Sequence, residues 1–406
     1  MKKGQLEQQI LLLVTLALVA FGLVMVYSAT SASAALANGD SSYYFRKQGL
    51  YALVGVVLLL VVRRSSYRGL RLLSPALVLG SIGLLLAVLA IGASVNGARR
   101  WLEVGPVVFQ PSELAKLGLV VFAAAYLARH PAPRTLGELI KPLGLVTGVV
   151  CALLLAEPDL GTAITIVIMI GGVLVVSGVP ARLMALAGSM FVTFVLIAAW
   201  FEPYRRARLL SFLNPWDDAQ GAGYQPVQAM IALGSGGIFG VGLGQSPQKV
   251  NYLPEAHTDM IFAIIGEELG LVGATALIAA YAAFAYAGFR VALGCRDPFG
   301  KRLAAGITTL VCGQALINLA AVMGAAPLTG ITLPFVSYGG SSLVVGLAAV
   351  GILLNIAGDD GRERRTSRVP DRNRRNRRTR ASGTGGSRST ARSRRRRDVR
   401  RVPRAV

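Results

Sequence analysis

The chain has 406 residues, of which 53% are hydrophobic and 15% are charged, and its formal net charge is +22. Globular domains carry about 25% charged residues, so this composition excludes a soluble globular enzyme. Residues 358–406 hold 19 arginines and 5 acidic residues, so 19 − 5 = +14 of the net charge lies in this tail. The remaining +8 is spread over short loops between apolar runs.

Ten apolar runs are long enough to cross a membrane, which takes about 20 residues each. Every run must be helical, because lipid offers the backbone no hydrogen-bond partners. The predicted spans are residues 10–30, 47–62, 72–92, 111–128, 142–156, 160–178, 183–201, 259–289, 303–326 and 336–356. The predicted fold is therefore an all-α polytopic membrane domain over residues 1–357, with a tail at 358–406.

Lysine and arginine concentrate in the even-numbered loops, which places these loops and both termini in the cytoplasm. Examples are Arg63 and Arg64 in the second loop and Lys301 and Arg302 in the eighth. Two outer loops, 94–110 and 202–258, also carry basic residues. The second is long, and long loops cross the membrane regardless of charge.

The long outer loop at 202–258 is of a size that is usually functional. Residues 224–239 mix apolar and polar side chains at helical spacing, interrupted by Gly234, Gly236 and Gly237. This stretch is either a short helix in the membrane interface or an ordinary solvated loop. The arginine-rich tail has too few apolar residues to form a core, so we expect it to be disordered and to bind anionic lipid headgroups, not nucleic acid.

Asp259 stands directly before the eighth span. Counting back about 20 residues from Arg290 places the outer edge of the hydrocarbon core near Gly270, so Asp259 lies at headgroup depth. Glu267 and Glu268 then lie at the outer interface, and Thr258 is predicted to cap the helix. Asp259 is either a general base for a membrane-anchored substrate or a helix-end residue without chemistry.

Further polar groups lie near the outer face. Glu113 and Lys116 share one face of the fourth span and form either a structural ion pair or part of a catalytic site. Arg100 and Trp101 suit diphosphate binding or interfacial anchoring equally. Glu157 and Asp159 could hold a metal, although a simple turn is favoured.

Gln314 and Asn318 are one turn apart, which favours interhelical hydrogen bonding. No Cys/His metal spacing, P-loop or GxSxG motif occurs, and the glycines at 240–244 follow no strand, which excludes a nucleotide-binding fold. His257, two residues before Asp259, is a better site candidate than His130.

Several motifs together resemble the SEDS family (shape, elongation, division and sporulation). They lie at residues 96–101, 110–116, 157–162, 211–217, 221–225, 242–246, 249–259, 266–270 and 333–342. Residues 244–249 (Gly-Gln-Ser-Pro-Gln-Lys) and 254–259 (Pro-Glu-Ala-His-Thr-Asp) resemble the division branch. Met260 replaces the phenylalanine usual in the family, and the long basic tail is not a family feature.

The resemblance implies a peptidoglycan glycosyltransferase that polymerises lipid II at the septum, on the outer side of the bacterial inner membrane. Asp259 matches the family's essential aspartate and is the proposed general base. The candidate substrate-binding residues are Arg100, Trp101, Glu113, Lys116, Arg205, Arg206, Gln225, Lys249, His257, Ser337 and Ser341. No metal ligand or cofactor is assigned, and a divalent cation is left open. The expected partners are a class B penicillin-binding protein, which is the septal transpeptidase, and other divisome membrane proteins.

The sequence is also compatible with three other functions: a lipid II flippase, an elongation-type polymerase, and a scaffold for the transpeptidase. A transporter would carry charges and broken helices at the membrane midplane. Here the charged residues gather at the outer face, which favours chemistry outside the cytoplasm.

Overall fold

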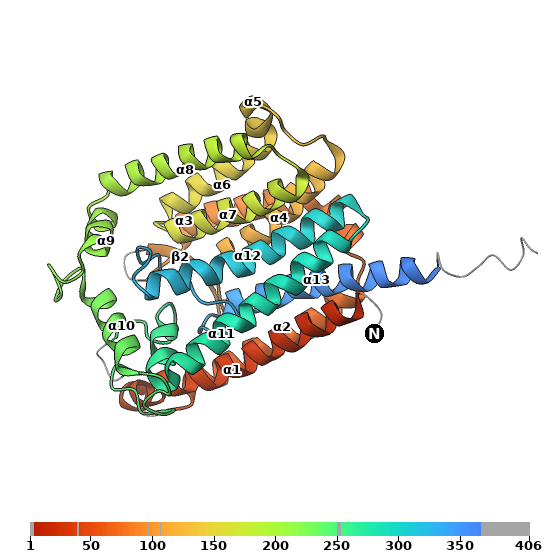
Figure 1. Cartoon of the computed structure of the whole chain (residues 1–406). Helices are drawn as coiled ribbons and strands as arrows, with labels where there is room; N and C mark the ends of the chain where they lie inside the picture. Colours follow the sequence, from red (N-terminus) through yellow and green to blue (C-terminus); the bar gives the residue numbers. More distant parts are fainter. Residues whose placement is uncertain (1–3, 39, 96–97, 106, 250–252, 367–406) are drawn as a thin grey trace, which may run out of the picture. The chain divides into compact units, whose positions relative to one another are not determined.

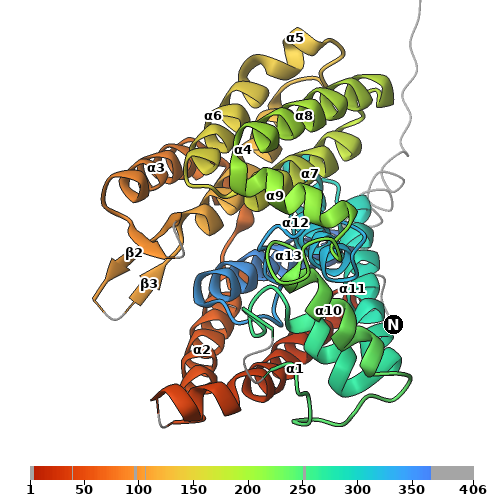
Figure 2. The same cartoon turned by 90° about the vertical axis from the view of Figure 1, so that its left-hand side faces the viewer.

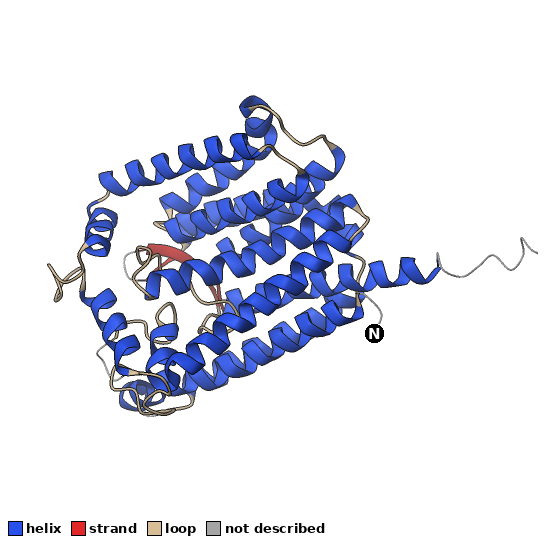
Figure 3. Ribbon diagram, in the orientation of Figure 1, coloured by secondary structure: helices blue, strands red, loops and turns tan. Residues whose placement is uncertain are grey.

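The computed structural model describes residues 4–38, 40–95, 98–105, 107–249 and 253–366. Helices dominate these residues (Figure 3), and ten are long and apolar enough to span a membrane. The main helices of these spans are α1 (Gln5–Asn38), α2 (Tyr43–Arg64), α3 (Leu70–Ile91), α4 (Pro111–Arg129), α6 (Leu145–Ala156), α7 (Leu160–Ser177), α8 (Ala181–Phe201), α11 (Ile261–Gly294), α12 (Pro298–Val322) and α13 (Gly340–Thr366). The predicted all-α fold with ten spans is confirmed.

Two spans begin with short helical segments. The 3-10 helix η1 (Tyr67–Gly69) precedes α3, and the fifth span consists of α5 (Leu136–Leu139), the π-helix η2 (Ile140–Gly144) and α6. Residues 1–362 form one compact unit, and residues 363–406 form a second. The predicted disorder of the tail concerns residues that lie almost entirely outside the described part of the chain.

The centre of the bundle consists of α4 and α12, the most buried spans. α12 packs against α11, α7 and α4, while α1 packs against α11 and α2 (Figure 1). α8 is the least buried span, and its exposed side chains include Phe194, Ile197 and Trp200. Apolar side chains that face outward on a spanning helix are stabilised by lipid.

Short elements gather at one end of the bundle, at the left in Figure 1 and facing the viewer in Figure 2. Strands β1 (Ala93–Val95), β2 (Ala98–Val104) and β3 (Val107–Phe109) form an antiparallel sheet in the order β1-β2-β3. The helices α9 (Pro203–Leu213) and α10 (Tyr224–Ser235) join α8 to α11. α10 confirms the predicted helix within 224–239, whereas the sheet and α9 were not predicted.

α11 departs from the predicted continuous helix in two places. Its first residue is Ile261, and Thr258 donates to Glu255 O at 3.0 Å and forms no helix cap, so the predicted capping role is wrong. The helix is also broken at Gly270, which has φ 64° and ψ −161°. A positive φ favours glycine because it lacks Cβ.

Candidate functional site

Asp259 lies in the turn before α11, at the end of the bundle that carries α9 and α10. Its position is fixed through its backbone, since Asn318 Nδ2 donates to Asp259 O at 2.7 Å. The same amide donates to Ile331 O at 2.7 Å and so ties the α12–α13 loop to this turn. The carboxylate itself accepts from Thr258 Oγ1 at 3.3 Å.

The surroundings of Asp259 change its acidity. Only 9% of the residue is exposed. Burial raises the pKa of its carboxyl to about 6, the nearby carboxylate of Glu255 adds to this rise, and the guanidinium of Arg208 opposes it. A carboxylate with a pKa close to neutrality can accept a proton efficiently in a reaction at physiological pH.

Helix α9 positions two guanidiniums on one face, because Arg205 and Arg208 are three residues apart. Arg208 Nη1 donates to Leu328 O at 3.4 Å, beside Asp259, whereas Arg205 Nη2 donates to Leu155 O at 3.0 Å, at the end of α6. Arg206 lies elsewhere, with its guanidinium 5.9 Å from the centre of the Trp200 ring. α9 therefore extends from the α6–α7 turn to the Asp259 turn.

The α6–α7 turn brings Arg100 and Arg205 together. Arg100 Nε donates to Glu157 O at 3.2 Å, and its Nη2 donates to Pro158 O. Arg205 binds the carbonyl of Leu155 at the end of α6, two residues before Glu157. Two of the predicted substrate-binding arginines thus converge on one short backbone segment from distant parts of the chain.

The two carboxylates of this turn, Glu157 and Asp159, have different surroundings. Asp159 caps α7, accepting from Thr162 N at 3.1 Å and Thr162 Oγ1 at 2.8 Å, which confirms the turn interpretation. Neither carboxylate oxygen of Glu157 has a hydrogen-bond partner among the described residues. Burial raises the pKa of Glu157 to about 8, Asp159 adds to the rise and Arg100 opposes it. Among the residues that the structure describes, no cluster of three His, Cys, Asp or Glu side chains could hold a metal.

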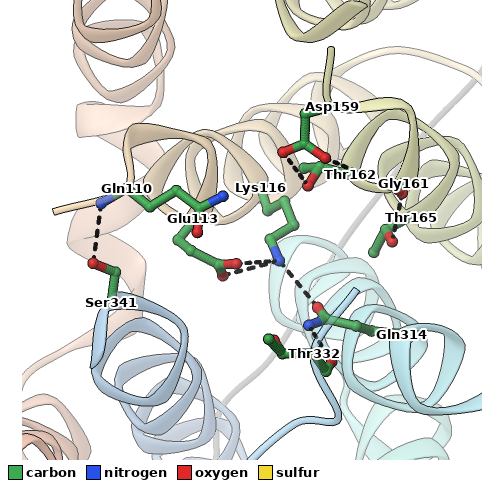
Figure 4. A network of polar contacts seen from close by, with 10 residues as sticks. All are labelled: Gln110, Glu113, Lys116, Asp159, Gly161, Thr162, Thr165, Gln314, Thr332 and Ser341. Atoms are coloured by element: carbon green, nitrogen blue, oxygen red, sulfur yellow. Dashed lines mark hydrogen bonds and ion pairs between the residues drawn. The ribbon is translucent and has the colours of Figure 1, made fainter. Parts of the chain in front are cut away.

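The predicted ion pair in α4 is present and is buried (Figure 4). Lys116 Nζ lies 2.9 Å from Glu113 Oε1 and donates to Gln314 Oε1 at 3.0 Å. Gln314 Nε2 in turn donates to Thr332 O at 3.0 Å. The predicted interhelical hydrogen bonding of Gln314 is confirmed, because its side chain on α12 accepts from Lys116 on α4. Through Gln314, the Glu113–Lys116 ion pair is also linked to the α12–α13 loop.

Both candidate serines hold backbone groups. Ser341 Oγ accepts from Gln110 N at 3.0 Å, which fixes the start of α4 (Figure 4). Ser337 Oγ accepts from Leu333 N at 2.7 Å inside the α12–α13 loop. These contacts shape the loop next to Asp259.

The remaining predicted site residues are dispersed. Gln225 Nε2 donates to Pro254 O at 3.3 Å, five residues before Asp259. The ring of His257 packs between Tyr44 and Tyr338, with ring centres 5.0 and 5.4 Å away. Lys249 Nζ lies 3.3 Å from Glu268 Oε1, and Trp101 lies half-buried in β2.

A pocket of about 350 Å³ opens beside Arg208, between α9, α10 and the α12–α13 loop. Its lining combines polar side chains with apolar ones, among them Arg208, Ser211, Asn214, Gln225, Phe212, Trp216, Met230 and Leu328. Mostly apolar walls with a few convergent polar groups are typical of ligand sites. Arg208 was not among the site residues predicted from the sequence, because α9 was not predicted. The three-residue spacing between Arg205 and Arg208 is the signal in the sequence that points to Arg208.

The family model for cell cycle proteins that covers FtsW, RodA and SpoVE matches residues 8–361. "Probable peptidoglycan glycosyltransferase FtsW" of Geobacter sulfurreducens is 42% identical over 351 residues, 86% of this chain and 94% of that protein. "Stage V sporulation protein E" of Bacillus subtilis is 40% identical over 358 residues, 86% and 96% of the two chains.

Solved structures similar to this chain come from the same group of proteins. A chain from a peptidoglycan synthase complex that coordinates polymerization and crosslinking is 31% identical, with a TM-score of 0.73 over 86% of this chain and 97% of that one. The rod shape determining protein RodA of Thermus thermophilus is 30% identical, with a TM-score of 0.65 over 86% and 96% of the two chains. This chain is therefore a member of the SEDS family of FtsW, RodA and SpoVE cell cycle proteins.

Proposed function

We propose that this protein is a division-type peptidoglycan glycosyltransferase that polymerises lipid II into glycan strands. The similarity to proteins named as probable peptidoglycan glycosyltransferases supports the reaction class. The observation that carries the residue assignment is the setting of Asp259, a buried carboxylate with a pKa of about 6 beside Arg208. Neither a flippase nor a scaffold calls for a proton acceptor in this position. An elongation-type polymerase would use the same one, and the similarity to proteins named FtsW favours the division type.

In the proposed reaction, Asp259 accepts the proton of the acceptor sugar's 4-hydroxyl while that oxygen attacks the anomeric carbon of the donor chain. The new glycosidic bond forms as the bond to the donor's diphosphate breaks, and polyprenyl diphosphate leaves with the bonding electrons. Positive charge near the leaving group stabilises the charge that develops there. Arg208 and Arg205 on one face of α9, with Arg100 at the α6–α7 turn, are the groups assigned to this role.

The decisive experiment supplies lipid II to the full chain, purified with a class B penicillin-binding protein as its membrane partner. We expect glycan strands and released polyprenyl diphosphate. Movement of lipid II between the leaflets of a vesicle without any polymer would instead support the flippase alternative. Cross-linked product that needs a separate polymerase would support the scaffold alternative.

The pH dependence of polymerisation offers a sharper test of the Asp259 assignment. The rate constant kcat/KM should rise with pH through about 6, because the base acts in its deprotonated form and the pKa of Asp259 is raised to that value. Arg208→Gln removes the charge that holds this pKa down, so the rise should move to higher pH. Glu255→Gln removes a charge that holds it up, so the rise should move to lower pH.

Each of these two shifts should be on the order of one pH unit. The measurement is the pH profile of lipid II consumption for the two variants, with Arg208→Lys as the control that keeps the positive charge. Shifts in the same direction for Arg208→Gln and Glu255→Gln would contradict Asp259 as the titrating base.

The proposed location is the bacterial inner membrane at the septum, with both termini cytoplasmic and Asp259 facing outward. In a variant without the native cysteines Cys151, Cys295 and Cys312, we expect an impermeant thiol reagent added outside to label Asp217→Cys, which is exposed in the outer loop. It should not label Ser382→Cys in the tail until the membrane is permeabilised. The reverse pattern would overturn the orientation, and with it the site of catalysis.

A further inference from the structure

A turn in the long loop forms backbone hydrogen bonds with α11 on both sides of its break at Gly270. Leu271 N donates to Gly237 O at 3.0 Å and Val272 N donates to Ile238 O at 3.1 Å. On the other side of the break, Val241 N donates to Glu267 O at 2.9 Å and Gly242 N to Glu268 O at 3.0 Å. Residues 237–242 therefore take over the backbone hydrogen bonds that the helix loses at Gly270.

Glycines make this close approach possible. A Cβ at Gly270 would lie 2.5 Å from Ile238 O, and a Cβ at Gly240 would lie 2.6 Å from Leu269 N. Both residues also have positive φ, of 64° and 82°. Gly240, one of the glycines at 240–244, thus allows the turn to contact the backbone of α11.

The hydrogen bonds fix the depth of this turn along α11. Gly270 lies about 20 residues, or about 30 Å of helix, from Arg290 at the other end of the span. This length equals the thickness of the hydrocarbon core. The turn at 237–242 is bonded to both sides of Gly270, so the same count of residues predicts that it lies near the boundary between hydrocarbon and headgroups.

The side chains of the turn are apolar and exposed. Phe239 is 81% exposed and Ile238 61%, and Val241 and Leu243 are exposed as well. They continue the exposed apolar surface of α11, where Leu271 is 58% exposed. Residues 219–248 contain no Asp, Glu, Lys, Arg or His, which is unlike a solvated loop.

We propose that residues 237–243 form a membrane anchor, whose side chains Ile238, Phe239, Val241 and Leu243 insert among the lipid acyl chains at the end of the bundle that carries Asp259. Lipid is the occupant because this surface is continuous with the lipid-facing side of a spanning helix. The backbone groups that bond to α11, among them Ile238 O and Val241 N, also meet the condition for contact with hydrocarbon, where an unpaired polar group is costly.

The anchor holds the loop that ends in Asp259. Beyond the turn, Ser246 Oγ donates to Glu267, and Lys249 Nζ lies 3.3 Å from Glu268 Oε1. Both carboxylates are buried on the first part of α11, which begins two residues after Asp259. Insertion of the turn therefore sets the depth of Asp259 relative to the lipid headgroups. Only this link to catalysis rests on the proposed function.

Spin labelling tests the anchor without any measurement of activity. In the full chain without its native cysteines, nitroxide labels are placed at Phe239→Cys, Leu271→Cys and Asp217→Cys, and each variant is reconstituted in phosphatidylglycerol–phosphatidylethanolamine nanodiscs. Leu271 is the lipid reference and Asp217 the water reference. Relaxation by oxygen, which concentrates in lipid, is compared with relaxation by a water-soluble nickel chelate.

We expect the logarithm of the oxygen-to-nickel accessibility ratio to be positive at Phe239 and Leu271 and negative at Asp217. A negative value at Phe239 would overturn the proposal, since it would place the turn in water. Protection of Phe239 from both reagents would overturn it too, because protein would then cover the turn. A second label at Leu243→Cys should repeat the Phe239 result, which guards against a local distortion at one position.

Discussion

Asp259→Asn should lower the rate of lipid II polymerisation by about 10²–10⁴-fold, the usual contribution of a general base. Asparagine has almost the same size as aspartate but cannot accept the proton of the attacking hydroxyl. The fold around the position should persist, since Asn318 binds the backbone carbonyl of residue 259 and not its side chain. The measurement is the rate of glycan strand formation by the purified complex with its transpeptidase.

Asp217→Asn is the matched control, because Asp217 is an exposed carboxylate in the same outer loop. Its polymerisation rate should equal that of the unaltered protein. Comparable amounts of transpeptidase should copurify with both variants. Near-normal strand synthesis by Asp259→Asn would remove this residue from the role of base.

Lys116→Met should destabilise the protein by about 3–5 kcal/mol, the typical effect of removing one partner from a buried ion pair. Lys116 and Glu113 are both buried, and the ammonium group also binds Gln314 on α12. Methionine fills a similar volume but leaves the Glu113 carboxylate without its partner. The measurement is denaturant-induced unfolding of the detergent-solubilised protein.

The double variant Glu113→Gln/Lys116→Met should recover much of this loss, because no buried charge is then left unpaired. Arg46→Met is the control at an exposed ion pair: Arg46 contacts Asp40 at the surface, where water screens the charges, and no measurable destabilisation is expected. If Lys116→Met abolished polymerisation at unchanged stability, the pair would belong to the catalytic site and would not be a structural link.

The sequence by itself determined the spanning helices and the leading catalytic candidate. Hydropathy is a local property, so ten apolar runs could be located without knowledge of their neighbours, and the part of the chain that the structure describes contains ten such helices. The spacing of Glu113 and Lys116 was enough to predict their pairing, since residues three apart share a helix face. Asp259 could be placed near the membrane edge by counting residues along a single span.

The tertiary structure decided everything that depends on contacts between distant segments. Arg208 lies beside Asp259 because α9 crosses the end of the bundle, and a helix rich in arginine has no hydropathy signal that would reveal it. The break at Gly270 could not be predicted from the hydropathy of the span, which does not depend on backbone geometry. It is stable only because residues 237–242 supply the missing hydrogen bonds, and such partners are found in space and not along the chain.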